Sequence, residues 1–348
     1  MAGPMMRAAV FRRHGGPEVL EHALVPAPRP AHDEVLIDVH ACGINHSDLD
    51  SRAGTSRWQF ELPFALGAEF AGTVRELGDD VRGVRVGQPV TALQQYSCGR
   101  CRACTSWRQD LCAAFTVFGT DRWGGYAEQV AVPARALVSL ASEDQFVVAA
   151  AAQTVVSTAW HMTVALAQVR AGETVLVPSA SGGVAGALVQ CAKRAGARVI
   201  ATVGSPAKLD AVADLGADEV FCHRDSPVGE TVARLTGGRG VDAVLDTVGG
   251  PLFGEHLGAL TPDGRLATCG AHAGERVELD VVALFQSGRR ILGFRVATPD
   301  EIEYSLQLAL SGVLRVPIHA TYGFDEAAQA HRALERREHV GKLVMVRR

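Results

Sequence analysis

The sequence predicts a two-domain α/β protein, with a β-rich domain followed by a parallel sheet that helices cover on both faces. Its 348 residues exceed what one ordinary hydrophobic core holds. The first 140 residues show short apolar stretches separated by Gly and Pro, whereas apolar strands alternate with helices after residue 145. Hydrophobic residues make up 47% and charged residues 21%, which is typical of a folded globular chain and not of a disordered one.

Charge and hydropathy exclude several classes of function. The formal net charge is −4, so nothing indicates nucleic acid as a partner. No apolar run is long enough to span a bilayer, and residues 1–14 lack the apolar stretch of a signal peptide. We therefore expect a cytoplasmic protein that acts on a small-molecule substrate and has no membrane partner.

The first part of the chain is expected to be mainly strand. Alternating or apolar stretches predict strands at residues 35–41, 70–77 and 126–132. Gly83 and Gly87 break residues 81–90 into turns. An Ala/Val-rich stretch without Gly or Pro, residues 145–166, predicts a long and largely buried helix.

The second part repeats a strand-then-helix unit. Helices are expected at residues 184–195 and 207–215, and strands at residues 174–178, 198–203, 219–221, 241–246, 265–269 and 291–295. Such alternation predicts a parallel sheet. The tail is expected to form helices at residues 301–310 and 325–336, then a strand at residues 341–346, and to fold back onto the first domain. We therefore assign residues 1–145 and 296–348 to the first domain and residues 146–295 to the second.

A glycine-rich turn, Ser179-Ala-Ser-Gly-Gly-Val-Ala-Gly186, follows the first strand of these units. Glycines at such a turn let the backbone approach a pyrophosphate group, which rests on the positive N-terminus of the next helix. An ordinary strand-to-helix turn is the alternative interpretation. The position inside a strand–helix–strand repeat favours dinucleotide binding, by Ser181, Gly182, Gly183 and Val184.

The end of the second strand of the repeat predicts which dinucleotide binds. An acidic residue there would hold a ribose 2′-hydroxyl and repel a 2′-phosphate. Residues 203–208 contain no carboxylate, whereas Ser205 can donate a hydrogen bond and Lys208 carries a positive charge. This favours NADP(H), unless Lys208 is only a solvated helix residue. A later strand ends before Thr247, Val248 and Gly249, which we expect to border the nicotinamide.

Four cysteines stand close together in the first part of the chain. Cys98, Cys101, Cys104 and Cys112 are separated by two, two and seven residues. Structural zinc takes four ligands in a tetrahedron, often all cysteine, so this spacing predicts one structural zinc ion. Disulfides or free buried thiols are the alternatives. Four protein ligands would leave no open position for catalysis.

Several short motifs follow one another in a recognisable order. They are Cys42-Gly-Ile-Asn-His-Ser-Asp48, Leu66-Gly-Ala-Glu-Phe-Ala-Gly72, the four-cysteine loop, residues 119–132, the glycine turn and Gly341-Lys-Leu-Val344. Over nearly its whole length the chain resembles the medium-chain dehydrogenase/reductase superfamily. The resemblance implies a GroES-like catalytic domain joined to a doubly wound Rossmann domain. It also implies a homodimer or homotetramer.

One departure from that superfamily is informative. Its zinc alcohol dehydrogenases bind a catalytic zinc through a Cys, a His and a further Cys, and the matching positions here are Asn45, Ala68 and Thr154. An amide, a methyl and a hydroxyl group cannot replace those ligands. We therefore expect no catalytic zinc. Asn45 with Asp48 is similar to the N-x-x-D pattern of quinone oxidoreductase-like members.

Without a catalytic zinc ion to act as a Lewis acid, fewer classes of substrate can be reduced. The carbon that accepts hydride must already be electrophilic, as in quinones and α,β-unsaturated carbonyl compounds, so we predict NADPH-dependent reduction of one of these. Asn45 is the candidate donor to the developing oxyanion, with a helix-capping role as the alternative. Asp48 is expected to orient its neighbours, and His46 or Ser47 could deliver a proton. Trp58, Trp123 and Tyr126 could line a substrate-binding cleft, or they could be packing residues.

Two other functions stay open. The chain could be a zinc alcohol dehydrogenase or carbonyl reductase with unusual ligands, which would need two zinc ions per chain. It could also be an NADPH-binding regulatory module with little turnover, which the loss of metal ligands would permit.

Overall fold

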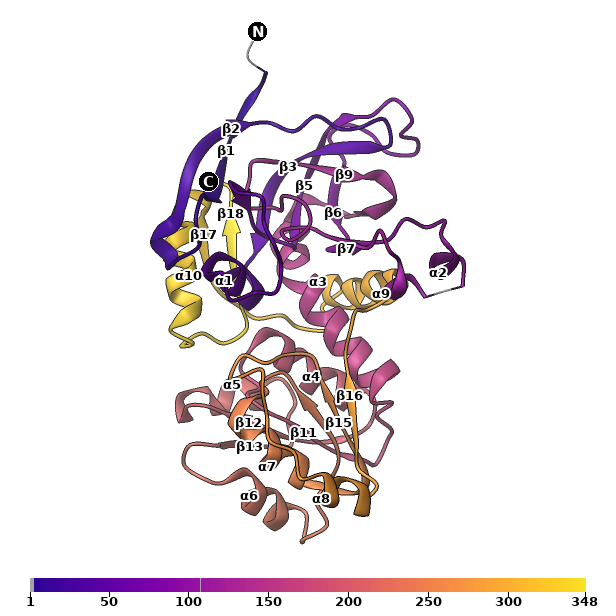
Figure 1. Ribbon diagram of the computed structural model, residues 1–348, viewed down its shortest axis with the longest axis vertical. Coiled ribbons are helices and arrows are strands. Elements are labelled where there is room, and N and C mark those ends of the chain that lie inside the picture. Colours follow the sequence, from indigo (N-terminus) through magenta and orange to yellow (C-terminus); the bar gives the residue numbers. More distant parts are fainter. Residues whose placement is uncertain (1–2, 107) are drawn as a thin grey trace. The chain divides into compact units, whose positions relative to one another are not determined.

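The computed structural model describes residues 3–106 and 108–348 (Figure 1). The chain divides into two compact units. Unit 1 comprises Met1–Thr154, Thr298–Ser311 and Ile318–Arg348, and unit 2 comprises Val155–Ala297 and Gly312–Pro317. The chain first passes from unit 1 into unit 2 within helix α3 (Phe146–Trp160). This helix continues as a π-helix over His161–Leu166. The long helix expected over residues 145–166 is therefore present, with a wider last turn.

The main sheet of unit 1 runs in the order β10-β6-β5-β3-β18-β17, and β9 also pairs with β3. Strand β3 (Glu34–Gly43) lies antiparallel to both β5 (Phe70–Leu77) and β18 (Lys342–Val346). Because β18 pairs with β3, the tail folds back onto the first part of the chain, as the sequence predicts. The other strands are β6 (Pro89–Ala92), β9 (Gln129–Pro133), β10 (Leu137–Ser139) and β17 (Ile318–Gly323).

A second sheet of unit 1, in the order β2-β1-β4, was not predicted from the sequence. Its strands β1 (Met5–Phe11) and β2 (Leu20–Pro26) form an antiparallel ribbon, and β4 (Phe64–Ala65) pairs with the end of β1. Strand β1 is buried along most of its length, so it lacks the alternation that marks a half-exposed strand. The remaining elements of unit 1 are α1 (His46–Ala53), α2 (Arg102–Thr105), α9 (Pro299–Leu310), α10 (Ala327–Glu335), β7 (Gln95–Tyr96) and β8 (Thr116–Val117).

Unit 2 is built on a parallel sheet in the order β13-β12-β11-β14-β15-β16. This is the doubly wound order, in which the chain leaves the first strand, β11, in both directions. The strands are β11 (Thr174–Val177), β12 (Arg198–Val203), β13 (Glu219–Cys222), β14 (Val241–Asp246), β15 (Leu260–Thr268) and β16 (Arg290–Gly293). The predicted α/β class, with a β-rich part and a doubly wound parallel sheet, is confirmed.

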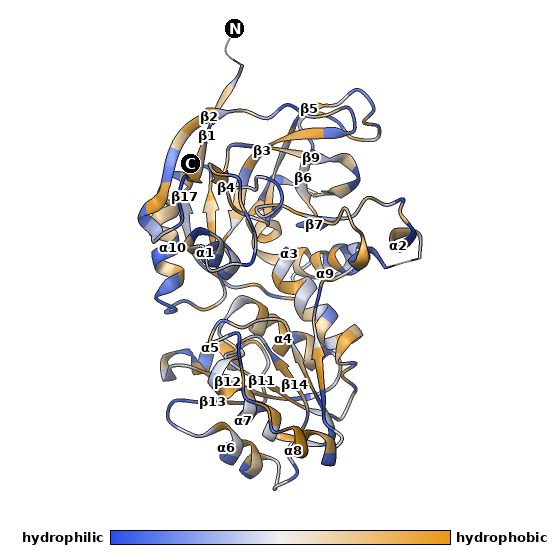
Figure 2. Cartoon of the chain, in the orientation of Figure 1, coloured by the Kyte–Doolittle hydropathy of each residue, from blue (hydrophilic) through white to orange (hydrophobic). Residues whose placement is uncertain are grey.

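Helices cover the sheet of unit 2 because its strands are apolar on both faces. Leu176, Ile200 and Val244 are completely buried and pack with side chains of α6 and α7 in one core cluster. Figure 2 shows the apolar colouring of these central strands. The helices are α4 (Gly183–Arg194), α5 (Leu209–Ala213), α6 (Val228–Leu235), α7 (Phe253–Gly258) and α8 (Val281–Gln286). Among the helices of residues 3–106 and 108–348, none is long and apolar enough to cross a membrane.

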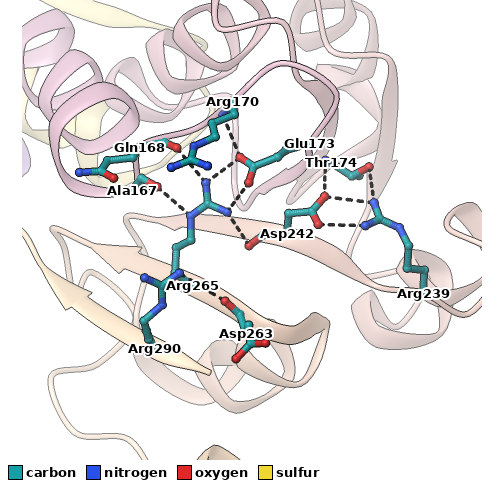
Figure 3. A network of polar contacts seen from close by, with 10 residues as sticks. All are labelled: Ala167, Gln168, Arg170, Glu173, Thr174, Arg239, Asp242, Asp263, Arg265 and Arg290. Carbon is teal, nitrogen blue, oxygen red and sulfur yellow. Dashed lines mark hydrogen bonds and ion pairs between the residues drawn. The ribbon is translucent and has the colours of Figure 1, made fainter. Parts of the chain in front are cut away.

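A buried arginine contacts residues near the amino ends of several strands of unit 2 (Figure 3). Arg265 lies on β15 with 9% of its side chain exposed, and it forms a two-pronged ion pair with Glu173, just before β11. It also donates to the backbone carbonyls of Ala167, Gln168 and Asp242. This network lies at the sheet edge opposite the carboxyl ends, where α/β sheets bind their ligands.

Candidate functional site

Asn45 stands at the turn between β3 and α1, with extended backbone angles of φ −123° and ψ 158°. Its backbone N–H donates to the Asp48 carboxylate at 2.8 Å. The Asp48 N–H in turn donates to the backbone carbonyl of Asn45, so the Asn45 side chain does not cap the helix. Asn45 thus holds the cap position, but its amide is turned elsewhere.

The Asn45 amide lies in a buried polar cluster with Glu69 and Lys342. Its Nδ2 donates to Oε1 of Glu69 at 2.6 Å, and its Oδ1 accepts from Nζ of Lys342 at 2.6 Å. Lys342 also pairs with the same Glu69 oxygen at 2.9 Å. The Glu69 side chain is completely buried and that of Lys342 is 5% exposed. The charges are buried, but each has an opposite partner.

Asn45, Ala68 and Thr154, which replace the zinc ligands of alcohol dehydrogenases, all lie next to Glu69. Oε2 of Glu69 accepts from the backbone N–H of Thr154 at 2.8 Å, and the Thr154 hydroxyl bonds to the side chain of Gln94. Ala68 precedes Glu69 in the chain and, like Asn45 and Thr154, is partly exposed. Within the described ranges, His, Cys, Asp and Glu side chains converge in groups of three or more only at the four cysteines.

Asp48 belongs to a second buried network and is placed to orient its neighbours. Its carboxylate accepts from the N–H groups of Asn45 and Gly67 and lies 3.4 Å from the Tyr126 hydroxyl. Burial raises the pKa of Asp48 to about 6, against the lowering effect of the Asn45 N–H and of Lys342. Tyr126 is completely buried and so packs in the core.

The other predicted residues of unit 1 lie apart from the buried cluster or at its edge. His46 is the partly exposed first residue of α1, next to Asn45, and Ser47 is exposed. Trp58 is half-exposed, whereas Trp123 lines an open groove with Gln59 and Glu61. The proton-donor role of His46 or Ser47 therefore stays a prediction.

The glycine turn of unit 2 joins β11 to α4 as expected. Gly182 is the cap of α4, with φ −75° and ψ 161°, and Gly183 is its first residue. A Cβ on Gly182 would meet nothing nearer than 3.9 Å, so the space above the turn is open, as a phosphate group requires. A Cβ on Gly186 would lie 2.9 Å from the end of the Leu215 side chain, so the glycine lets α4 pack closely against Leu215. The turn fits a bound dinucleotide.

Two basic residues that sequence reasoning missed lie beside the expected 2′-phosphate position. Strand β12 ends at Val203, and Ser205 caps the short 3-10 turn Pro206–Lys208. Strand β13 lies parallel to β12, so His223 and the exposed Arg224 follow it at the same edge, and the His223 N–H donates to the Val203 carbonyl. Only the strand order brings these two segments together.

The loop after β14 is held at the same carboxyl edge. Asp246 is completely buried and accepts from the Gly249 N–H at 2.9 Å, and the Val248 carbonyl accepts from Ala273 N–H. Strand β14 adjoins β11, so Thr247, Val248 and Gly249 lie at the point where the strand order reverses. Ligands of doubly wound sheets bind there.

The four cysteines converge as a tetrahedral site requires. Their sulfur atoms all lie within 4.8 Å of one another, with Cys101 and Cys104 3.5 Å apart and Cys98 and Cys104 3.9 Å apart. Zinc–sulfur bonds of about 2.3 Å place tetrahedral sulfurs roughly 3.8 Å apart, so the geometry fits zinc. Residue 107, within this loop, lies outside the described residues.

Local hydrogen bonds prepare part of the cluster for ionisation. Backbone N–H groups of Arg100 and Cys101 lower the pKa of Cys98 to about 6. The N–H groups of Cys98 and Ala114 lower the pKa of Cys112, but burial and the hydrogen bonds with Cys98 and Cys104 outweigh them and raise it to about 11. Four crowded thiols cannot all ionise alone, and a divalent cation removes that conflict.

Comparisons with known proteins agree with this architecture. Residues 31–142 match the alcohol dehydrogenase GroES-like domain, and residues 183–311 match the zinc-binding dehydrogenase family. A quinone oxidoreductase of Sus scrofa is 29% identical over 98% of both chains. The crystal structure of an NAD-dependent alcohol dehydrogenase is 38% identical, with a TM-score of 0.93 over 98% of this chain and 99% of that chain. A cobalt- and zinc-bound thermostable alcohol dehydrogenase of Pyrobaculum aerophilum is 31% identical, with a TM-score of 0.88 over 99% and 100%.

Proposed function

Since the chain belongs to the medium-chain dehydrogenase/reductase superfamily, we propose that it is an NADPH-dependent reductase that transfers hydride to a quinone or an α,β-unsaturated carbonyl compound. It does so without a catalytic zinc ion. One observation carries the proposal: the Glu69 carboxylate is engaged by Asn45, Thr154 and Lys342. An ammonium group stands beside that carboxylate, and the neighbouring side chains are not metal ligands.

The substrate class follows from this donor set. Hydride addition to a conjugated system moves negative charge onto an oxygen atom. Asn45 can stabilise that oxygen with an N–H of its amide, since a neutral donor serves where no cation reaches the substrate. An unactivated ketone or alcohol needs stronger polarisation than one amide supplies, so conjugated substrates are favoured.

The second unit supplies the cofactor site. Ser181, Gly182, Gly183 and Val184 would hold the pyrophosphate at the start of α4, and the loop of Thr247, Val248 and Gly249 would border the nicotinamide. Ser205 and Lys208 would hold the 2′-phosphate, with Arg224 as a further cation at the same edge. When bound, NADPH supplies the hydride.

A structural zinc ion is part of the proposal. The four thiolates would hold it, close a loop that has little regular structure, and leave no open position for substrate. Thiols kept reduced for metal binding suit the cytoplasm, where we place the protein.

We also propose a homodimer. Strand β16 is the last strand in the order of its sheet, and Ile291 on it is exposed. Helix α8 exposes Val281, Val282 and Phe285 and is strongly apolar (Figure 2). Pairing with a second copy would cover these side chains. A Phe285→Lys chain should then be monomeric in light scattering, and a monomeric wild-type chain would refute the proposal.

The second candidate function is that of an alcohol dehydrogenase, because the 38% identical structure bears that description. Initial rates with NADPH and a panel of quinones and enones, beside simple ketones, separate the two. We expect conjugated substrates to be reduced at least about a hundredfold faster than simple ketones, with a comparable loss in Asn45→Ala. Preferred turnover of simple ketones or alcohols would favour the alternative. Tight NADPH binding with no turnover would indicate a regulatory module.

A further inference from the structure

Lys342 uses its whole ammonium group inside the cluster. Its Nζ donates to the Ile44 carbonyl at 2.8 Å, to Oδ1 of Asn45 at 2.6 Å and to Oε1 of Glu69 at 2.9 Å. An ammonium group has three hydrogens, so this geometry leaves none for a substrate. Lys342 therefore cannot itself serve as a proton donor without breaking the cluster.

These contacts fix which way the Asn45 amide faces. Lys342 can only donate, so it must meet the amide oxygen, and the Glu69 carboxylate can only accept, so it must meet the amide nitrogen. A flipped amide would set its NH₂ group against the Lys342 ammonium and its oxygen against the Glu69 carboxylate, so both hydrogen bonds would be lost. The chemistry of the neighbours, and not packing alone, therefore sets a single orientation.

One hydrogen of the Asn45 amide stays available. Nδ2 carries two hydrogens and Glu69 takes one, and within residues 3–106 and 108–348 no acceptor takes the other. Asn45 is partly exposed, whereas Glu69 and Lys342 lie buried behind it. The free N–H therefore belongs to the one member of the cluster that a substrate can reach.

We propose that Lys342 is a positioning residue that locks the Asn45 amide with its free N–H toward the substrate oxygen. This inference rests on the proposed function, in which that oxygen gains negative charge. The cation at Oδ1 also draws electron density from the amide and makes its N–H a stronger donor. Glu69 balances the charge and holds the other amide hydrogen.

Balancing the charge of Glu69 does not by itself explain the contact of Lys342 with the Asn45 amide. Buried ion pairs are often replaceable by neutral side chains without loss of stability, because desolvation offsets their attraction. Lys342 is the first residue of β18, and backbone pairing holds the strand whatever the side chain. The contact of Lys342 with Oδ1 of Asn45 is the part of this arrangement that charge balance at Glu69 does not require.

The test removes both charges together, so that no buried charge is left unpaired. In Lys342→Met with Glu69→Gln, the new glutamine accepts from Thr154 and must offer its NH₂ to Asn45, which turns the Asn45 oxygen toward it. We expect the kcat for the best quinone or enone to fall on the order of 10²-fold, as in Asn45→Ala, with KM little changed. Lys342→Arg keeps the cation and should stay within about tenfold of the wild type.

A double-mutant cycle isolates the positioning role. In an Asn45→Ala chain, the paired change at Lys342 and Glu69 should lower kcat no further, because the amide to be positioned is gone. An equal further loss would place the action of Lys342 elsewhere and overturn the inference. Wild-type kcat in the charge-neutral pair would overturn it as well.

A measurement without turnover separates this inference from the proposed function. In the wild type, the NMR chemical shifts of the Asn45 side-chain NH₂ group should differ from those of an ordinary asparagine. In the variant with Lys342→Met and Glu69→Gln, they should move toward the ordinary values. Unmoved signals would refute the positioning role even in an active enzyme. Shifted signals in a wild type that reduces no quinone or enone would refute the proposed function alone.

Discussion

The hydroxyl group of Tyr126 lies 2.9 Å from Nε2 of His331, and both side chains are completely buried. Nδ1 of His331 faces a guanidinium N–H of Arg52 at 3.2 Å, so it must accept, and the proton of the neutral ring sits on Nε2. The phenol oxygen thus accepts from His331 Nε2–H, and the hydroxyl hydrogen is donated to Asp48. This chain of hydrogen bonds holds Asp48, whose carboxylate accepts from the backbone N–H of Asn45 at the start of α1.

Acid should destabilise the protein through His331. Burial and the nearby Arg52 lower the pKa of His331 to about 3, from 6.5 when exposed. Below pH 6.5 the unfolded chain binds a proton that the folded chain refuses, so the contribution of His331 is complete above 6.5 and is lost as pH falls toward 3. Asp48 opposes this, because its raised pKa favours the folded chain below about pH 6.

His331→Gln keeps an acceptor and a donor but does not titrate. We expect its free energy of unfolding, from urea titrations at about pH 7 and about pH 5, to fall less with acid than that of the wild type. The exposed His22→Gln is the matched control and should follow the wild type. Parallel pH curves for His331→Gln and the wild type would refute this role.

The buried arginine of unit 2 should carry a large share of stability. Arg265→Met leaves the Glu173 carboxylate without its ionic partner and three backbone carbonyls without the Arg265 donor, which should cost about 3–5 kcal/mol in urea unfolding. Arg12→Met is the control, because both partners of the Arg12–Glu21 pair are more than half exposed. A loss as small as that of the control would mean that solvent replaces the Arg265 contacts.

Cofactor preference should depend on cations at the edge shared by β12 and β13. Lys208→Ala and Arg224→Ala should each raise the KM for NADPH about tenfold and leave that for NADH nearly unchanged. The exposed Arg234→Ala on α6 is the control. Equal effects on both cofactors, or a wild type that prefers NADH, would contradict the assignment.

The cysteine loop should depend on its metal. Cys104→Ser should lose zinc and lower the melting temperature, since three ligands leave the structural site open. Cys269→Ala, outside the loop, should keep its zinc. A fully stable, metal-free Cys104→Ser chain would show that the loop holds itself.

Features that depend on nearby residues could be predicted from the sequence. The four cysteines are neighbours in the chain, and so are the strand and helix that flank the glycine turn, so local spacing indicated both. The parallel sheet followed from repeated apolar strands and helices. Strand β1 was missed, because its burial removed the alternation that marks a half-exposed strand.

The partners of the site residues could not be predicted in this way. Glu69 stands within one of the recognised motifs, but nothing local links it to Lys342, which stands 273 positions later and reaches it only through the pairing of β18 with β3. His331 and Arg224 were missed for the same reason. Sequence spacing indicates which groups are present, and strand order decides which of them meet.

The metal content of the purified wild-type chain tests the central claim most directly. Elemental analysis by mass spectrometry should find one zinc ion per chain, and replacing the four cysteines should remove it. Two zinc ions per chain, or one that survives loss of the cysteines, would place a metal at the site of Asn45 and Glu69 and contradict the account.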